Sequence, residues 1–295
     1  MVDTDHSKQH PLSICIVGIG LMGASFAMAL RAAGDTRHIV GISRSEETRN
    51  KALARGIVDA ATTDLAEGVR DADIVILCTP VQLLIQQIGQ LATLCKPGAM
   101  ITDMGSTKTE IVKALDALPE HLFAIGSHPM CGKETAGIDV AEATLYQGAP
   151  WVLTRSRRTN DETFSTIKAL AEKVGAIPRE IPVEQHDVLL SFASHLPYVL
   201  STALVSTTDQ FAISQNMPQV WQVMAGGYRD TSRVAASDVT MWLDILLTNR
   251  SAILNAVRDF QFNLDQFAAM LERHDESGLK VWMSQAAAAR RAKYG

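Results

Sequence analysis

Three clusters of polar residues have the types and spacing needed for acid–base and carboxylate chemistry. They read Asp103-Met104-Gly105-Ser106-Thr107-Lys108, Ser127-His128-Pro129-Met130-Cys131-Gly132-Lys133-Glu134 and Ser194-His195-Leu196-Pro197-Tyr198. The first two follow predicted strands, so they fall at the carboxyl edge of a parallel sheet, where open α/β sheets bind ligands. His128 is the expected proton acceptor because imidazole titrates near neutral pH. A histidine that only caps the end of a strand is the alternative.

The third cluster lies on a predicted helix that Pro197 must bend, since proline lacks the backbone donor. Asp187, Ser191 and His195 are spaced i, i+4 and i+8 and share one helix face. This face can bring His195 into the site, although a satisfied core histidine is the alternative. His186 points roughly the opposite way, and we expect it to cap the helix or to face solvent.

A glycine-rich turn follows the apolar strand SICIV and precedes a predicted helix. The turn consists of Gly18, Ile19, Gly20, Leu21, Met22 and Gly23 and has the pattern GxGxxG. In this strand–turn–helix context the pattern predicts a dinucleotide site in which the first helix turn holds the pyrophosphate. Thr79 and Pro80, directly after the strand Asp73–Cys78, and Ser106 are expected to complete the cofactor contacts.

The end of the second strand, HIVGI, indicates which nicotinamide cofactor is used. NAD sites usually place an acidic residue there to bind the ribose hydroxyls, whereas this chain has Ser43, Arg44 and Ser45. Hydroxyl groups beside a guanidinium suit a 2′-phosphate, which predicts a preference for NADP. The alternative is that Arg44 stacks on the adenine and that NAD is also used.

The first half of the chain alternates short apolar runs with helical stretches, which predicts a parallel sheet covered on both faces. The expected strands are Ser13–Gly18, His38–Ile42, Asp73–Cys78, Ala99–Asp103 and His121–Gly126, with Pro150–Leu153 and Ala176–Ile181 extending the sheet. After about Pro182 the apolar spacing becomes helical to the end. We therefore expect a Rossmann-like α/β dinucleotide-binding domain over 1–182, with 1–11 as a flexible arm. An all-α domain for substrate binding and dimerisation should occupy 183–295.

Composition excludes several other classes of protein. The 295 residues carry 27 Lys and Arg against 32 Asp and Glu, with a net charge of −5 and 5% aromatics, which argues against a nucleic-acid partner. No stretch reaches the eighteen or so apolar residues needed to span a bilayer, and the polar start is no signal peptide, so we expect a cytoplasmic protein with no membrane partner. The four cysteines form no CxxC pair, and we expect reduced thiols and no metal site.

Together with GGYRDTSR at Gly226–Arg233, the three clusters resemble those of the prephenate and arogenate dehydrogenase family. The resemblance covers the chain from about Ser13 to about Leu247. It implies a homodimeric enzyme that oxidatively decarboxylates a cyclohexadienyl acid on the route to tyrosine, with hydride transfer to NAD(P). Whether the substrate is prephenate, arogenate or both stays open.

The resemblance also implies roles for individual residues. His128 takes the proton of the ring hydroxyl, Ser106 hydrogen bonds the substrate hydroxyl and the nicotinamide side, and Arg233 binds the ring carboxylate. Alternatively, Ser106 is only a helix N-cap. Glu134 is implied to be an acid at the site entrance, and the alternative is an exposed surface residue. Arg229 is either a second substrate-binding arginine or the ion-pair partner of Asp230. Tyr198 stands where many relatives have a second histidine; it keeps a hydrogen-bond donor but no cationic form near pH 7.

Two other functions are alternatives to oxidative decarboxylation. A β-hydroxyacid dehydrogenase also joins a GxGxxG domain to a helical domain, but it uses a catalytic lysine there, and this chain has no lysine between Pro182 and Leu271. A protein that senses dinucleotides without catalysis would not need His128 and Ser106, and both are present.

Overall fold

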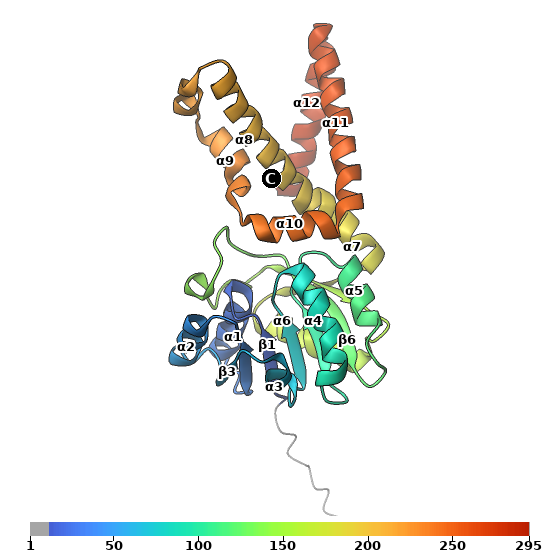
Figure 1. The fold of residues 1–295 in the computed structure, drawn as a ribbon. Coiled ribbons are helices and arrows are strands. Elements are labelled where there is room, and N and C mark those ends of the chain that lie inside the picture. The colour runs from blue at the N-terminus through green and yellow to red at the C-terminus, as the bar shows by residue number, and fades with distance from the viewer. Residues whose placement is uncertain (1–11, 295) are drawn as a thin grey trace, which may run out of the picture. The chain divides into compact units, whose positions relative to one another are not determined.

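The computed structural model describes residues 12–294, so the arm expected at 1–11 lies outside the described residues. The described chain contains one eight-stranded sheet with the order β3-β2-β1-β4-β5-β6-β7-β8 (Figure 1). The strands are β1 (Ile14–Val17), β2 (Ile39–Ile42), β3 (Ala60–Thr62), β4 (Ile74–Leu77), β5 (Met100–Asp103), β6 (Phe123–Pro129), β7 (Pro150–Arg155) and β8 (Ile177–Glu180). β6 and β7 pair antiparallel and the other neighbours pair parallel. The predicted Rossmann-like sheet is confirmed, with the short strand β3 as an addition.

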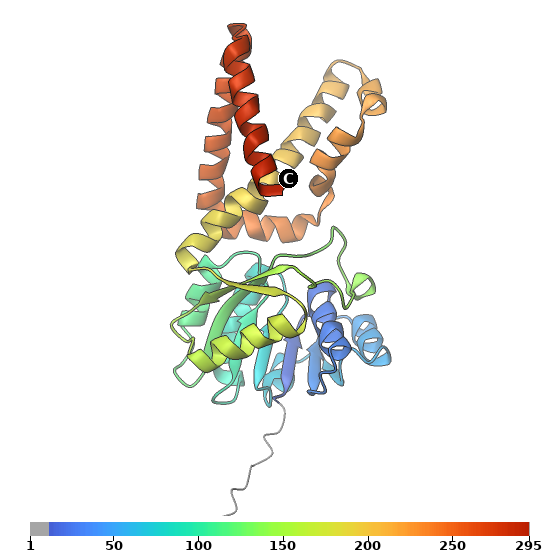
Figure 2. The same ribbon diagram turned by 180° about the vertical axis from the view of Figure 1, so that it is seen from behind.

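Helices cover both faces of the sheet, as the apolar strands require. In β1, Ile14 and Ile16 join one core cluster, whereas Cys15 and Val17 join the other. The first cluster is closed by α1 (Leu21–Ala32), α2 (Glu46–Ala54) and α6 (Asp161–Lys173), the second by α3 (Leu65–Val69), α4 (Val81–Leu94) and α5 (Thr109–Asp116). Figure 2 shows α6 lying across the face that is turned away in Figure 1. The sheet is therefore packed on both faces, and its carboxyl edge carries the loops that follow the strands.

The rest of the described chain is helical, which confirms the predicted change of class. It consists of α7 (Val183–Leu190), a π-helical segment (Ser191–His195), α8 (Leu196–Ser214), α9 (Gly226–Ser232), α10 (Val239–Thr248), α11 (Arg250–Glu272) and α12 (Glu276–Tyr294), with 3-10 turns at Pro218–Val223 and Arg233–Ala236. By compactness the chain divides after Arg250, so α7–α10 belong with the sheet and α11–α12 form a separate helical hairpin. The domain boundary expected between residues 182 and 183 stays a prediction.

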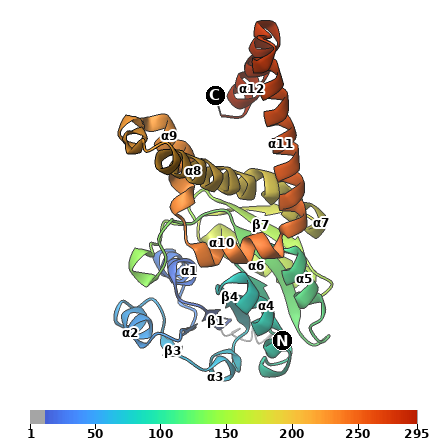
Figure 3. The same ribbon diagram turned by 45° about the horizontal axis from the view of Figure 1, so that its top comes forward.

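Two carboxylates of the helical segment join α7 and α10 to the sheet domain. Asp244 accepts hydrogen bonds from Gln82 N (3.1 Å) and Gln82 Nε2 (2.8 Å), so it caps α4, whose own N-cap is proline. Asp187 does the same for α5, accepting from Lys108 N (2.7 Å) and Thr109 N (2.9 Å). Negative charge at the first turn of a helix is stabilising. Figure 3 shows α10 lying along the edge of the sheet beside α4.

The helical run Val183–Ser214 is apolar enough to cross a bilayer by length and composition, with a mean hydropathy of 1.6. The expectation that no such stretch exists therefore needs correction, because the count of consecutive apolar residues overlooked a long run interrupted by a few polar ones. Core helices of water-soluble proteins meet the same criterion. This helix carries the buried residues Asp187 and His195. Asp187 accepts a hydrogen bond from the sheet domain, and His195 contacts Asn249, which follows α10. In the apolar 18-residue part of the run, 28% is buried.

Candidate active site

The loop after β5 is held by a buried ion pair. Lys108 and Asp103 are both fully buried, and Lys108 Nζ lies 2.6 Å from Asp103 Oδ2. Lys108 Nζ also donates to Gly105 O (2.7 Å), while Asp103 accepts from Gly105 N (2.8 Å) and Ser127 N (2.9 Å). Breaking such a pair leaves an uncompensated buried charge, which is strongly destabilising. The pair thus fixes the loop that carries Ser106 and ties it to the strand that carries His128.

His128 is buried and is linked through a second histidine to a carboxylate. His128 Nδ1 lies 3.1 Å from His186 Nε2, and His186 Nδ1 lies 2.7 Å from Asp187 Oδ1. The expectation that His186 caps the helix or faces solvent is wrong, because its side chain is 0% exposed. α7 contacts both α5 and β7, so more than one of its faces is covered.

The chain of contacts defines which nitrogen of each ring carries the proton. Hydrogen bonds from His186, Thr109 and Lys108 hold the pKa of Asp187 well below its usual range despite burial, so the carboxylate is ionised and accepts from His186 Nδ1–H. His186 Nε2 is then the acceptor for His128 Nδ1–H. Burial, with the nearby Lys108 charge, lowers the pKa of His128 well below 6.5. His128 is therefore neutral, with its free lone pair on Nε2.

His195 lies within the π-helical segment, a feature that often marks functional sites. Its ring is buried, meets Trp242 edge-to-face at 6.0 Å, and places Nδ1 3.1 Å from Asn249 Nδ2. Burial lowers the pKa of His195 from 6.5 to about 4. Asn249 was not predicted from the sequence, since an asparagine after a helix is typical of a simple C-cap.

Ser106 is half-buried, and its side chain forms no hydrogen bond within residues 12–294. The alternative role as a helix N-cap does not hold: Lys108 is the N-cap of α5, and the side chain that caps this helix is Asp187. The Ser106 hydroxyl therefore remains available to a ligand.

The two arginines expected to bind the carboxylates of the substrate are less buried than the histidines. Arg233 forms an ion pair with Glu134, with side chains 63% and 45% exposed, so the structure brings together two residues that were predicted separately. Arg229 is exposed, and no ion pair with Asp230 forms within the described part of the chain. Tyr198 stacks face to face on Trp242 at 3.7 Å and is buried. One face of its ring is thus used in packing, and its hydroxyl can still make a polar contact.

The glycine-rich turn fits a dinucleotide. Gly18 has φ +97°, and a Cβ there would lie 3.0 Å from the Cys78 backbone; a Cβ on Gly23 would lie 2.3 Å from Gly18 O. A Cβ on Gly20 would meet nothing within 4 Å, and α1 begins there with no side-chain cap and no acid in its first turn. Free N–H groups facing open space are what a pyrophosphate requires.

The ribose end of the expected cofactor site lies where β2 meets α2. Ser45 caps α2 by accepting from Thr48 N (3.2 Å), and Arg49 Nη1 donates to Ser43 O (2.7 Å) and Arg44 O (3.1 Å). Arg44 is exposed, and its side chain has no hydrogen bond or ion pair among the described residues. Thr79 donates to Gln87 (2.6 Å), and Pro80 precedes α4. Arg49, a second guanidinium at this loop, was not predicted.

Among residues 12–294 no cluster of three or more His, Cys, Asp or Glu side chains is arranged to hold a metal ion. The four cysteines are free thiols. Burial raises the pKa of Cys131 to about 12 and that of Cys95 to about 11, so both thiols are protonated near neutral pH.

A Rossmann-like sheet with a glycine-rich turn that fits a pyrophosphate, and with a neutral histidine near its carboxyl edge, is typical of nicotinamide-dependent dehydrogenases. The comparisons with known proteins narrow the class. Residues 26–178 match the family model "Prephenate dehydrogenase, nucleotide-binding domain", and residues 182–285 match "Prephenate dehydrogenase, dimerization domain". The chain belongs to the prephenate dehydrogenase family.

Individual relatives agree with this assignment. The prephenate dehydrogenase of Lactococcus lactis subsp. cremoris is 34% identical over 95% of this chain and 77% of its own. The cyclohexadienyl dehydrogenase of Zymomonas mobilis is 33% identical over 89% of both chains. The crystal structure of prephenate dehydrogenase from A. aeolicus, in complex with hydroxyphenyl propionate and NAD+, has a TM-score of 0.88 at 30% identity and covers 97% of this chain and 99% of its own. This likeness decides against the β-hydroxyacid dehydrogenase and the non-catalytic alternatives.

The buried histidines predict how stability depends on pH. Groups whose pKa is lower in the folded chain bind more protons when unfolded, so the free energy of unfolding falls as pH drops below about 6.5. His128, His186 and His195 are all shifted in this direction. Between about pH 7 and about pH 5, above the range where carboxylates titrate, His195 alone should account for a loss of about 2 kcal/mol.

Urea unfolding at fixed protein concentration measures this slope. His195→Gln should make the slope shallower, because the buried imidazole that resists protonation is removed. A free energy of unfolding that stays constant over this window would contradict the neutral, buried state of the three rings.

Proposed function

We propose that this chain oxidatively decarboxylates prephenate or arogenate, with His128 as the proton acceptor. The observation that carries the proposal is the Asp187–His186–His128 chain, which leaves a neutral imidazole with its lone pair on Nε2 beside the Ser106 loop. A nicotinamide dinucleotide on the glycine-rich turn supplies the hydride acceptor. The relatives named prephenate and cyclohexadienyl dehydrogenase support the substrate class.

In this mechanism the chain's residues hold the substrate and move one proton. Arg233 binds the ring carboxylate, and Ser106 hydrogen bonds the ring hydroxyl. His128 Nε2 takes the hydroxyl proton as hydride leaves the same ring carbon, which turns that carbon into a carbonyl. The bond between the opposite ring carbon and its carboxylate then breaks, CO₂ leaves, and the electrons of that bond stay in the ring. The oxygen becomes a phenolate and takes the proton back from His128, so the proton balance closes.

Steady-state kinetics with both acids and both cofactors test the function. We expect turnover with at least one of the two acids, giving an aromatic product and reduced nicotinamide. The absence of turnover with every combination would refute the proposal.

We propose that NADP is preferred over NAD. The support is the loop Ser43–Ser45, which has no carboxylate at the strand end. The Arg44 guanidinium has no partner among residues 12–294, and Arg49 donates hydrogen bonds to the loop backbone. Ser43→Asp should shift kcat/KM toward NAD, because a carboxylate repels a 2′-phosphate and binds ribose hydroxyls. A wild-type enzyme with higher kcat/KM for NAD would contradict the preference; the NAD+ bound to the A. aeolicus relative keeps NAD as the alternative.

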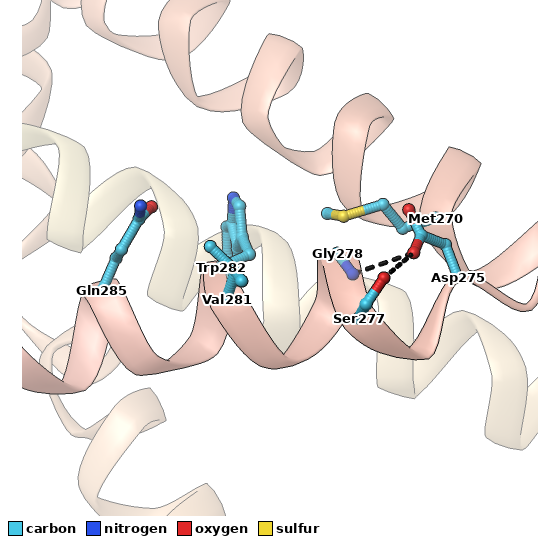
Figure 4. A pocket seen from close by; sticks show the side chains of 7 residues that line it. All are labelled: Met270, Asp275, Ser277, Gly278, Val281, Trp282 and Gln285. Atoms are coloured by element: carbon cyan, nitrogen blue, oxygen red, sulfur yellow. Dashed lines mark hydrogen bonds between the residues drawn. The ribbon is translucent and has the colours of Figure 1, made fainter.

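We also propose that the enzyme is a homodimer joined through its helical part. Large apolar side chains are exposed on α11 and α12, among them Phe262, Leu264, Leu271, Val281 and Met283. Figure 4 shows Met270, Val281 and Trp282 lining an open pocket near the turn between these helices, where Asp275 caps α12. Uncovered apolar surface of this kind marks interaction sites, and the matching family model is described as a dimerization domain.

Light scattering tests the dimer. We expect a species of about 64 kDa, twice the chain mass of 32.0 kDa, at micromolar concentration. Charged substitutions at Phe262 and Leu264 should shift it toward the monomer. A stable 32.0 kDa species of the wild type would refute the dimer. A cytoplasmic location and the lack of nucleic-acid and membrane partners stay predictions.

A further inference from the structure

We propose that Asn249 is a positioning residue that fixes His195 as a neutral imidazole with its proton on Nε2. His195 would then donate a hydrogen bond to an oxygen of the substrate, while His128 accepts a proton. The two site histidines would thus be held in opposite tautomers by different neighbours. The tautomer follows from contacts within the chain, whereas its use rests on the proposed function.

The side-chain amide of Asn249 has one possible orientation. Its Nδ2 lies 2.7 Å from the backbone carbonyl oxygen of Asp187. A carbonyl oxygen can only accept, so the atom facing it must be the amide nitrogen and not the amide oxygen. The same carbonyl also accepts the backbone N–H of Ser191, which uses its second lone pair.

The same amide nitrogen defines the state of the imidazole. Asn249 Nδ2 has two hydrogens; one points to Asp187 O, and the other faces His195 Nδ1 at 3.1 Å. A nitrogen that receives a hydrogen bond carries no proton, so the proton of neutral His195 must sit on Nε2. Protonation of Nδ1 would place two donors against each other in a buried site. This adds to the burial that lowers the pKa of His195 to about 4.

The geometry leaves Nε2 for a ligand. No described contact uses His195 Nε2, and it is not among the buried polar side-chain atoms that lack a partner. Trp242, edge-to-face against the ring, and Asn249, bonded to Nδ1, hold the ring from two sides. A donor with its orientation set before binding costs less entropy when it meets an acceptor oxygen of the acid.

The neighbouring Thr248 offers a matched control. Thr248 Oγ1 lies 2.9 Å from Thr107 Oγ1 and also bonds to Asp244 O (2.7 Å). It therefore connects the same end of α10 to the sheet domain without touching His195. Thr248→Val removes a comparable hydrogen bond and leaves the imidazole contact in place.

The test is the ¹⁵N NMR spectrum of the full-length protein labelled in its histidine rings, with His195 assigned from the signals lost in His195→Gln. In the wild type and in Thr248→Val, the Nε2 of His195 should show the upfield shift of a protonated nitrogen. In Asn249→Asp the carboxylate accepts from the ring, so the proton should move to Nδ1. With either acid, kcat/KM should then fall about 10- to 100-fold, chiefly through KM, and Asn249→Ala should fall less.

A wild-type His195 protonated on Nδ1 would overturn the inference, and this result needs no variant to fold. So would an Asn249→Asp enzyme that keeps the wild-type spectrum, or one whose kcat/KM stays within about twofold of the wild type although the tautomer has reversed. The spectrum does not depend on turnover. An enzyme that is inactive with both acids would refute the proposed function, and the spectrum would still report the tautomer of His195.

Discussion

His128→Ala should lower kcat by roughly two to four orders of magnitude, the usual contribution of a general base. The ring nitrogen Nε2 is the only site on this residue with a free lone pair, since Nδ1 is bonded to His186. Binding of the dinucleotide should change little, because the glycine-rich turn lies on a different strand–helix junction. Single-turnover kinetics with saturating cofactor and substrate measure the effect directly.

His121→Ala is the matched control for this variant. His121 lies just before β6 and His128 lies near its end, but the side chain of His121 is exposed. The control should keep wild-type kcat. His128→Ala with near wild-type turnover would remove His128 from the mechanism and leave the Asp187–His186–His128 chain as a purely structural feature.

Arg233→Ala should cost about 30- to 1,000-fold in kcat/KM, the effect of losing a charge-assisted bond to the ring carboxylate. The melting temperature should change little, because Arg233 and its partner Glu134 are 63% and 45% exposed and such pairs contribute about 0–1 kcal/mol. Arg233→Lys should fall between the wild type and Arg233→Ala, since lysine keeps the charge but loses the planar fork.

Arg229→Ala provides the comparison. Its predicted alternative partner, Asp230, does not pair with it among the described residues, so this variant should also keep its melting temperature. If Arg229→Ala loses substrate affinity while Arg233→Ala retains it, the two arginines have been assigned the wrong way round.

Features with strict local requirements could be predicted from the sequence. The GxGxxG turn was recognisable because Gly18 needs a positive φ and Gly23 a close backbone approach. The strand that delivers His128 was recognisable because its apolar residues are buried on both faces of the sheet. In both cases the chemistry of a few neighbouring residues determines the local structure.

Contacts between distant segments could not be predicted in the same way. His186 and Asn249 reach the site only because α7 packs against α5 and β7 and because α10 ends beside His195. Helical spacing placed His186 on the face opposite to the one that carries Ser191 and His195. The spacing carries no information on how many faces of α7 are covered by other elements. The π-helical segment at Ser191–His195 also breaks the regular spacing on which that prediction relied.

The most direct test of the proposed reaction is its stoichiometry, measured as CO₂ released and nicotinamide reduced in the same sample. Oxidative decarboxylation of prephenate or arogenate should give equal amounts of both, together with one equivalent of a phenolic product. Loss of His128 should slow both to the same extent. Reduced nicotinamide without CO₂, or CO₂ without reduced nicotinamide, would contradict oxidative decarboxylation at this site.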